Sequence, residues 1–275
     1  MTRRRLRRAV TAAAALALVV FCIAAVWWWR VPVELGAWRS GPPPHPWAAW
    51  QRQEAVWRAE GVRRRISHAY VPLDHISVEV PLAVLVSEDI SFFAHGAIDL
   101  EAVKEAVRQW QEGHRLRGAS TISQQLAKNL FLSGERTLWR KLEEARLANA
   151  MERSLGKRRI LELYLNVVEF GPGLLGVEAA AQHDYGSSAA ALDAAQAAGL
   201  AAAIPSPGRD TPITASQRWE VRRGIILARM ARASWLRERL ERLRLEPAAA
   251  PTSGGGLTAI APRPHAALAN PAGDH

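Results

Sequence analysis

The sequence has a single cysteine, few lysines and no long run of alternating polar and apolar residues. Because Cys22 stands alone, an intrachain disulfide framework and a cysteine-based zinc site are excluded. No lysine follows Lys157, so the S-x-x-K sequence at 154–157 lacks the K-T-G partner of penicillin-recognising enzymes. Without a preceding strand, the G-x-G-x-x-G sequence at 171–176 does not indicate a dinucleotide site. The chain also has no internal repeat.

The charge excess is concentrated at the N-terminus. The net charge is +10, and half of it comes from the five arginines within residues 3–8. The rest of the chain is mildly basic, which argues against nucleic acid as a partner and leaves room for a local anion site. A content of 49% hydrophobic and 23% charged residues excludes a wholly disordered chain.

Residues 9–29 carry no charge. As a helix they would extend about 30 Å, the thickness of one bilayer core, with Trp27, Trp28 and Trp29 at the interface. The arginines before this segment would keep the N-terminus in the cytoplasm and place the rest outside the cytoplasmic membrane, on its periplasmic or extracellular side. A cleaved signal peptide is the alternative, but its apolar core would be shorter, so we expect an uncleaved single-pass anchor.

The remaining chain is expected to fold as one mainly helical domain of roughly 210 residues between a spacer and a tail. A Pro-rich stretch begins at Gly41, and Trp47, Trp50 and Trp57 then share one helical face. That helix either packs on the domain or lies on the lipid surface, and both interpretations stay open. The expected helices cover 81–89, 100–110, 121–132, 137–155, 158–170, 177–181, 189–203 and 214–245, with a basic loop at 113–118, a turn at 171–176 and a disordered Ala/Pro-rich tail over 246–275.

Glu88 is the first candidate for chemistry. It follows Val84-Leu85-Val86 and precedes two phenylalanines, and apolar neighbours favour the protonated form of a carboxyl, which suits general acid–base work. The alternative is an acidic helix end in solvent. A metal site at His95 is less favoured because no second histidine stands at ligand spacing.

A second group of candidates follows Gly118. Thr121 and Gln124 fit a T-x-x-Q capping box, which predicts a helix start. Lys128 lies on the same face as Gln124, with Gln125 and Asn129 beside it, and Arg136 follows the helix. A helix N-terminus with added cations predicts a phosphate or pyrophosphate site, although polar helix faces are often only solvated.

Glu144 lies four residues after Arg140 and three after Lys141. Two flanking cations favour its charged form, in contrast to the apolar setting expected for Glu88. A surface ladder of ion pairs is the alternative interpretation.

Five ordered motifs between about residues 71 and 209 resemble the family 51 peptidoglycan glycosyltransferases, specifically the monofunctional biosynthetic transglycosylases. They begin at Glu88 (EDISFFAHGAID), Gly118 (GASTISQQLAKNLF), Arg140 (RKLEEA), Lys157 (KRRILELYLN) and Phe170 (FGPGLLGVEAAA). The resemblance implies a lysozyme-like, two-lobed fold that polymerises lipid II into linear glycan strands, with inversion at MurNAc C1 and release of undecaprenyl pyrophosphate. It divides the chain into a basic tail (1–8), an anchor (9–29), a membrane-proximal spacer and helix (30–66), a glycosyltransferase domain (67–245) and the tail (246–275).

The resemblance also assigns roles. Glu88 is expected to be the general base and Glu144 the second essential acid, on the leaving-group side. No cofactor is required, although a divalent cation, Mg²⁺ or Mn²⁺, could bridge the pyrophosphate and Glu144. The implied partners are lipid II, the growing glycan chain, the membrane, and cell-wall synthesis or division proteins. The residues expected to contact substrate are Phe92, His95, Ser120, Thr121, Gln124, Gln125, Lys128, Asn129, Arg136 and Arg140.

Two positions depart from the family pattern. Glu105 stands where a basic residue is usual, and Asp184-Tyr185 replaces a Tyr-Phe pair. Two other functions remain as alternatives. One is a hydrolase of the same fold class, a lysozyme or lytic transglycosylase, which would not need the cations at 128 and 136. The other is a non-catalytic membrane scaffold, against which the intact Glu88 and Glu144 argue.

Overall fold

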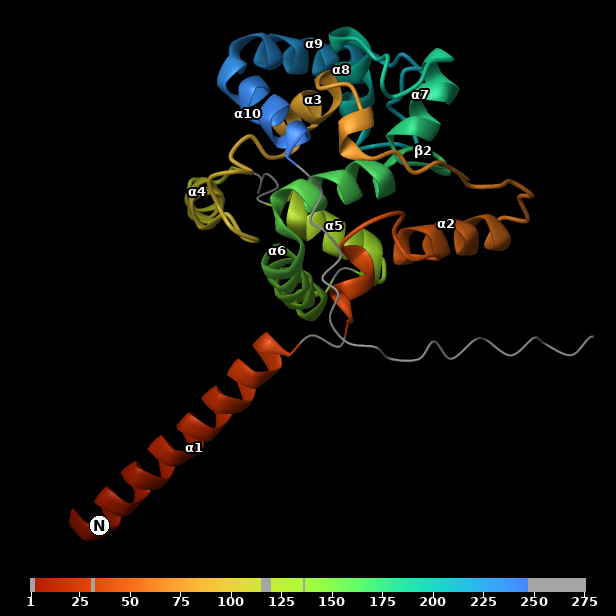
Figure 1. Cartoon of the computed structure of the whole chain (residues 1–275). Coiled ribbons are helices and arrows are strands. Elements are labelled where there is room, and N and C mark those ends of the chain that lie inside the picture. Colours follow the sequence, from red (N-terminus) through yellow and green to blue (C-terminus); the bar gives the residue numbers. More distant parts are fainter. Residues whose placement is uncertain (1–2, 31–32, 115–119, 136, 247–275) are drawn as a thin grey trace, which may run out of the picture.

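A computed structural model describes residues 3–30, 33–114, 120–135 and 137–246, with side chains from residue 15 onward. The chain is mainly helical, as the sequence predicts, and its few strands are short (Figure 1). Most of the tail predicted over 246–275 and most of the loop at 113–118 lie outside the described residues.

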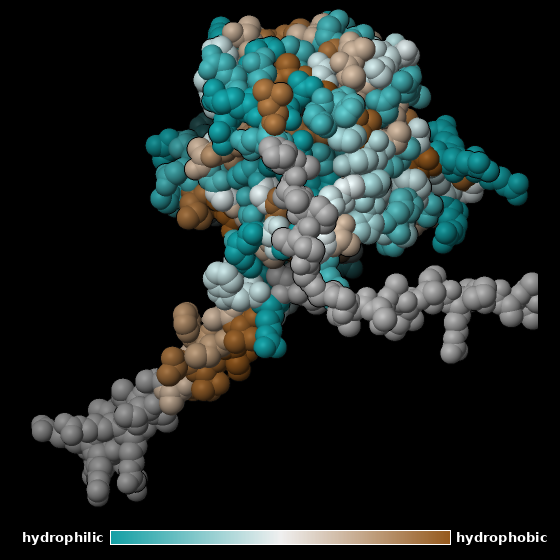
Figure 2. Space-filling view, viewed as in Figure 1, coloured by the Kyte–Doolittle hydropathy of each residue, from teal (hydrophilic) through white to brown (hydrophobic). Residues whose placement is uncertain are grey.

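Helix α1 (Arg3–Trp29) contains the segment predicted as an anchor and projects away from the rest of the chain (Figure 1). Its described part is largely hydrophobic, whereas the body is mostly hydrophilic on the face shown in Figure 2. Within the part of the chain that the structure describes, no helix has the length and apolar character needed to cross a membrane. The C-terminal end of α1 contacts the body, because Trp27 lies 5.1 Å from the ring of Trp139 and beneath the guanidinium of Arg146.

The tryptophan-bearing helix packs on the domain. Helix α2 (Ala48–Ala59) follows a short 3₁₀ turn, η1 (Leu35–Trp38), and contacts α5. Trp47 and Trp57 are only 2% and 6% exposed, and Trp50 packs at the edge of the core. Of the two interpretations of this helix, the structure therefore supports packing against protein.

Helix α3 (Glu79–Glu88) forms the centre of the core. Its residues from Val80 to Val86 are all buried, because α8 (Ala194–Ala203), α9 (Gln217–Arg232) and α10 (Ser234–Leu245) surround it. A helix that is apolar on every side is stable only when enclosed in this way. Glu88 therefore stands at the point where the buried helix ends.

Two antiparallel helices carry most of the remaining candidate residues. Helix α5 (Ile122–Phe131) packs along α6 (Leu138–Val167), and Thr121 forms the predicted capping box with Gln124. The predicted helix end at Gly156 is confirmed. Two helical segments of α6 meet there at a kink, because Gly156 adopts φ 72° and ψ 166°, a non-helical conformation that glycine reaches without a Cβ clash.

Three short strands and three further elements complete the described chain. Strand β3 (Leu174–Leu175) lies between β1 (Ser67–His68), to which it is parallel, and β2 (Glu169–Gly171), to which it is antiparallel. The glycines of the G-x-G-x-x-G sequence thus form a hairpin. A Cβ on Gly176 would lie 2.6 Å from the carbonyl oxygen of Asn166, so only glycine fits. The other elements are η2 (Leu73–His75), α4 (Leu100–Gln111) and α7 (Val177–Tyr185).

Two further predictions differ from the structure in detail. The helix expected over 214–245 is broken at Ala233 into α9 and α10, and the one expected from 189 begins at Ala194. The helix expected over 100–110 forms as α4, with Leu100 and Trp110 64% and 61% exposed.

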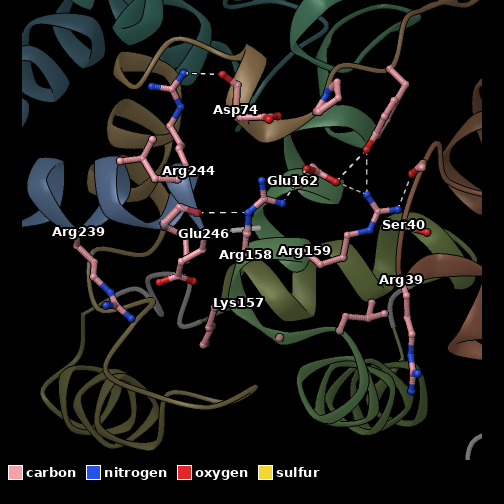
Figure 3. A pocket seen from close by; sticks show the side chains of 17 residues that line it. Arg39, Ser40, Asp74, Lys157, Arg158, Arg159, Glu162, Arg239, Arg244 and Glu246 are labelled. Atoms are coloured by element: carbon pink, nitrogen blue, oxygen red, sulfur yellow. Dashed lines mark hydrogen bonds and ion pairs between the residues drawn. The ribbon is translucent and has the colours of Figure 1, made fainter. Parts of the chain in front are cut away.

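A buried charge cluster on α6 binds segments that are distant in the sequence, at residues 38–41, 70–73 and 243 (Figure 3). Glu162 is 4% exposed and accepts hydrogen bonds from Arg159, Tyr70 and the backbone of Leu73, and it also pairs with Arg158 at 3.4 Å. These groups lie in a cavity of about 660 Å³ between α6, α10 and residues 39–41. Its buried cations thus already have partners: Arg159 donates to the carbonyls of Trp38 and Gly41, and Arg158 to that of Leu243.

We expect Glu162→Gln to lower the free energy of unfolding by about 3 kcal/mol, because it leaves a buried guanidinium without its counter-charge. Chemical denaturation measures this loss. The control is Glu101→Gln, which removes the exposed Glu101–Lys104 pair and should cost less than about 1 kcal/mol. Equal losses in the two variants would contradict the assignment.

Candidate functional site

The carboxylate of Glu88 is held by polar groups from three elements. Its Oε1 accepts a hydrogen bond from Arg222 of α9 at 2.8 Å and from Ser87 at 3.1 Å, and its Oε2 accepts one from Gln125 of α5 at 3.2 Å. The expectation of a purely apolar setting is therefore wrong. Apolar residues bury the helix behind Glu88, while the carboxyl group itself faces a cation.

Gln125 connects Glu88 to the rest of the site. Its amide nitrogen donates to Glu88, and its carbonyl oxygen accepts from the hydroxyl of Tyr164 at 2.9 Å. Tyr164 is completely buried, and this burial raises the pKa of its phenol, so the hydroxyl stays a donor. The hydrogen bond thus fixes which end of the Gln125 amide points toward Glu88.

Asp89 fixes the position of α5 relative to Glu88. Its Oδ2 accepts from the backbone nitrogen of Ile122 at 2.9 Å, in the first turn of α5, and its Oδ1 lies 2.8 Å from Nε2 of His95. The carboxylate satisfies one of the free amides at the helix N-terminus. Because Asp89 directly follows Glu88 in the sequence, this hydrogen bond also holds Glu88 in position relative to α5.

Glu144 is buried between two cations. It is 2% exposed, its Oε2 pairs with Arg140 at 2.7 Å, and its Oε1 accepts from Lys141. The burial excludes the surface ladder as an account of this residue. Lys141 also donates to the hydroxyl of Ser120 at 2.8 Å, which places Ser120 beside the pair.

Lys128, Asn129, Gln125 and Arg140 line one pocket of about 530 Å³. Lys128 makes no hydrogen bond or ion pair with any described residue, and burial lowers the pKa of its ammonium, with nearby arginines adding to the effect. A half-buried cation without a direct partner is suited to bind an anion. Because Gln125 also contacts Glu88, the pocket and Glu88 belong to one site.

Several predicted substrate contacts have structural roles in the fold. Phe92 is fully buried beneath the ammonium of Lys157, and His95 binds Asp89. Thr121 and Gln124 are 3% and 4% exposed and satisfy each other's backbone in the helix cap. Arg136 lies outside the described residues.

Two arginines that the sequence analysis did not identify also lie at the site. Arg222, 134 residues after Glu88, pairs with it, and Arg52 of α2 lines the pocket with Lys128. Neither stands in a recognisable motif. The only signal available was the presence of other arginines on the same helices, one on α2 and four on α9.

A divalent cation that bridges the pyrophosphate and Glu144 stays a prediction. No group of three or more His, Cys, Asp or Glu side chains suited to a metal occurs in the described chain. Both oxygens of Glu144 are already paired with cations, which would compete with a metal ion for the same lone pairs.

The two departures from the family pattern lie away from this pocket. Glu105 pairs with Arg108 on the surface of α4. Asp184 lies at the end of α7, where burial raises the pKa of its carboxyl.

Residues 55–231 match the family model described as Transglycosylase. The chain is also similar to curated proteins named biosynthetic peptidoglycan transglycosylase. The Nitrosospira multiformis protein is 42% identical over 68% of this chain and 82% of its own length, and that of Shewanella oneidensis is 40% identical over 72% and 80%. The Methylobacillus flagellatus protein is 50% identical over 52% of this chain and 62% of its own length.

The His95–Asp89 contact predicts a pH dependence of stability. Burial alone would lower the pKa of His95, but hydrogen bonds to Asp89 and to the carbonyl of Gly96 raise it above its ordinary value. The stabilisation is therefore complete below the unfolded pKa of about 6.5 and is lost as pH rises through the folded value. We expect the melting temperature to fall across this range in the native chain and to change less in His95→Gln. A native-like pH profile in His95→Gln would contradict this, and His75→Gln, at an exposed site, is the control.

Proposed function

The chain belongs to the transglycosylase family, and within the peptidoglycan glycosyltransferase activity of that family we propose that it polymerises lipid II into linear glycan strands. One observation carries this proposal. Gln125 donates a hydrogen bond to Glu88 and also lines the pocket that contains Lys128 and Arg140. A base at one end and fixed cations at the other are what transfer from a diphosphate-linked donor requires.

In the proposed reaction Glu88 is the general base. Its carboxylate takes the proton from the 4-hydroxyl of the acceptor GlcNAc while that oxygen attacks C1 of the donor MurNAc. The bond between C1 and the diphosphate oxygen breaks with inversion, and its electron pair leaves with undecaprenyl pyrophosphate. Arg222 and Gln125 donate hydrogen bonds to the carboxylate and hold it in place.

The leaving diphosphate gains negative charge as the bond breaks. Lys128 and Arg140 are fixed donors for this charge, and Arg136 joins them on the strength of the sequence alone. Glu144 acts on the same side by orienting Arg140 and Lys141, each of which it contacts directly. A hydrolase would have no use for these cations, so the pocket favours the polymerase over a lysozyme-like enzyme.

We expect Glu88→Gln to abolish polymerisation of lipid II in detergent while the fold persists, because an amide cannot accept the acceptor's proton. Product strands are measured by gel, with a moenomycin-type inhibitor as control. The matched variant is Glu101→Gln on exposed α4, which should retain full activity. Full activity of Glu88→Gln, or release of sugars from purified peptidoglycan by the native chain, would contradict the proposal.

We further propose that residues 9–29 attach the enzyme to the cytoplasmic membrane, with the catalytic domain on the outer side. The support is the uncharged segment with five arginines before it, together with exposed apolar residues where α1 meets the body. Leu138 is 91% exposed and Trp139 61%, and Trp139 contacts Trp27.

Full-length protein is expected to stay in the membrane fraction after an alkaline carbonate wash. Replacing Leu18 and Phe21 of α1, both exposed, with arginine should release it, because each charge at mid-bilayer costs about 2.5–3.5 kcal/mol. Replacing the exposed Val221 and Ile225 of α9 with arginine is the control and should leave the protein in the membrane. Release of the unmodified chain by the wash would show that the segment is not an anchor.

A further inference from the structure

Arg52 enters the pocket from outside the part of the chain that matches the family. It lies on α2, three residues before the matched range begins at residue 55. It nevertheless lines the same cavity of about 530 Å³ as Lys128 and Arg140. One terminal nitrogen of Arg52 donates to the carbonyl of Leu132, just after α5, so the side chain is held in a defined position.

The three cations lie close enough to act on one another. Burial lowers the pKa of Lys128 and that of Arg52. Glu144 raises the first and Glu169 the second, while Arg52 and Arg140 lower the pKa of Lys128 and Arg140 lowers that of Arg52. Like charges that depress one another's pKa raise the free energy of the empty pocket. An anion bound among them would remove this repulsion.

The acids of the pocket do not fully balance these charges. Glu135 is exposed and Glu169 is half-buried, so two carboxyls face three cations in the lining. Glu144 is next to Arg140 but also paired with Lys141. Arg140 further buries its Nε without a hydrogen-bond partner among the described residues, and Lys128 has no direct partner there either. Donors are therefore left over for a ligand with several acceptor oxygens.

We propose that Arg52 is a third fixed cation of the diphosphate subsite, contributed by the helix in which the matched range begins. The inference rests on the proposed function, and it assigns Arg52 to binding the leaving group of the donor substrate. A guanidinium that uses one nitrogen on the Leu132 carbonyl still has other N–H groups to offer a phosphate oxygen. Arg52 also lies beside Gly134, whose Cβ position is 3.4 Å from the Arg52 side chain, so it borders the loop leading to Arg136.

The test compares three full-length variants in detergent. Arg52→Gln can still donate to the Leu132 carbonyl but has no charge, whereas Arg52→Lys keeps the charge. Arg58→Gln removes an exposed arginine from the same helix and is the matched control. The readouts are the dissociation constant of inorganic pyrophosphate by calorimetry and kcat/KM for lipid II.

We expect Arg52→Gln to weaken pyrophosphate binding and to lower kcat/KM, each about tenfold, as the loss of one charge-assisted hydrogen bond implies. Arg52→Lys should recover most of both, and Arg58→Gln should match the native chain. Unchanged pyrophosphate affinity in Arg52→Gln would overturn the proposal, even if the variant were less stable or less active.

Lys128→Gln separates this proposal from the proposed function. If Lys128→Gln weakens pyrophosphate binding and Arg52→Gln does not, the diphosphate site stands and the role of Arg52 is wrong. If the native chain does not polymerise lipid II at all, the proposed function fails, and the pyrophosphate measurement still decides whether Arg52 belongs to an anion site.

Discussion

The site depends on the carboxylate of Asp89. It follows Glu88 in the chain and accepts from the first turn of α5, so the end of the buried helix α3 and the start of α5 are fixed to each other. Gln125, Lys128 and Asn129 all project from α5. A shift of that helix would move the amide that contacts Glu88 and the cation of the pocket together. The capping box of Thr121 and Gln124 and the contact with His95 reinforce the same junction.

A second constraint is the way charge is distributed along α6. Near its start, Glu144 is buried between Arg140 and Lys141, and beyond the kink at Gly156, Glu162 is buried among Arg158 and Arg159. Each cluster pairs one buried glutamate with two cations, but the two clusters have different roles. The first leaves Arg140 facing an open pocket, whereas in the second Arg158 and Arg159 donate to carbonyl oxygens and so join distant segments of the chain.

Local patterns were enough to predict the helices, the cap on α5 and the ion pairs of Glu144, because each depends on residues three or four apart. The candidate site residues were predicted from five motifs whose order along the chain resembles that of one enzyme family. Local patterns could not show that Arg222 pairs with Glu88 or that Arg52 lines the same pocket as Lys128, since these helices are far apart in the chain. They also did not separate side chains that face the pocket from those that support it. Phe92 and Gln124 belong to motifs yet are buried, because packing between helices decides which side of a motif is exposed.

Arg146 of α6 donates hydrogen bonds to the carbonyls of Trp27, at 2.7 Å, and Arg30, at 2.9 Å, at the end of α1. The Trp27 carbonyl lies in the last turn of α1, where no intrahelical donor remains, and Arg30 directly follows the helix, so the body supplies the C-terminal cap of α1. The junction is thus a specific joint with its own stereochemistry. Grafting an unrelated apolar helix onto residue 30 would preserve hydrophobicity but not this joint, and the orientation of the globular part relative to its N-terminal helix would no longer be specified.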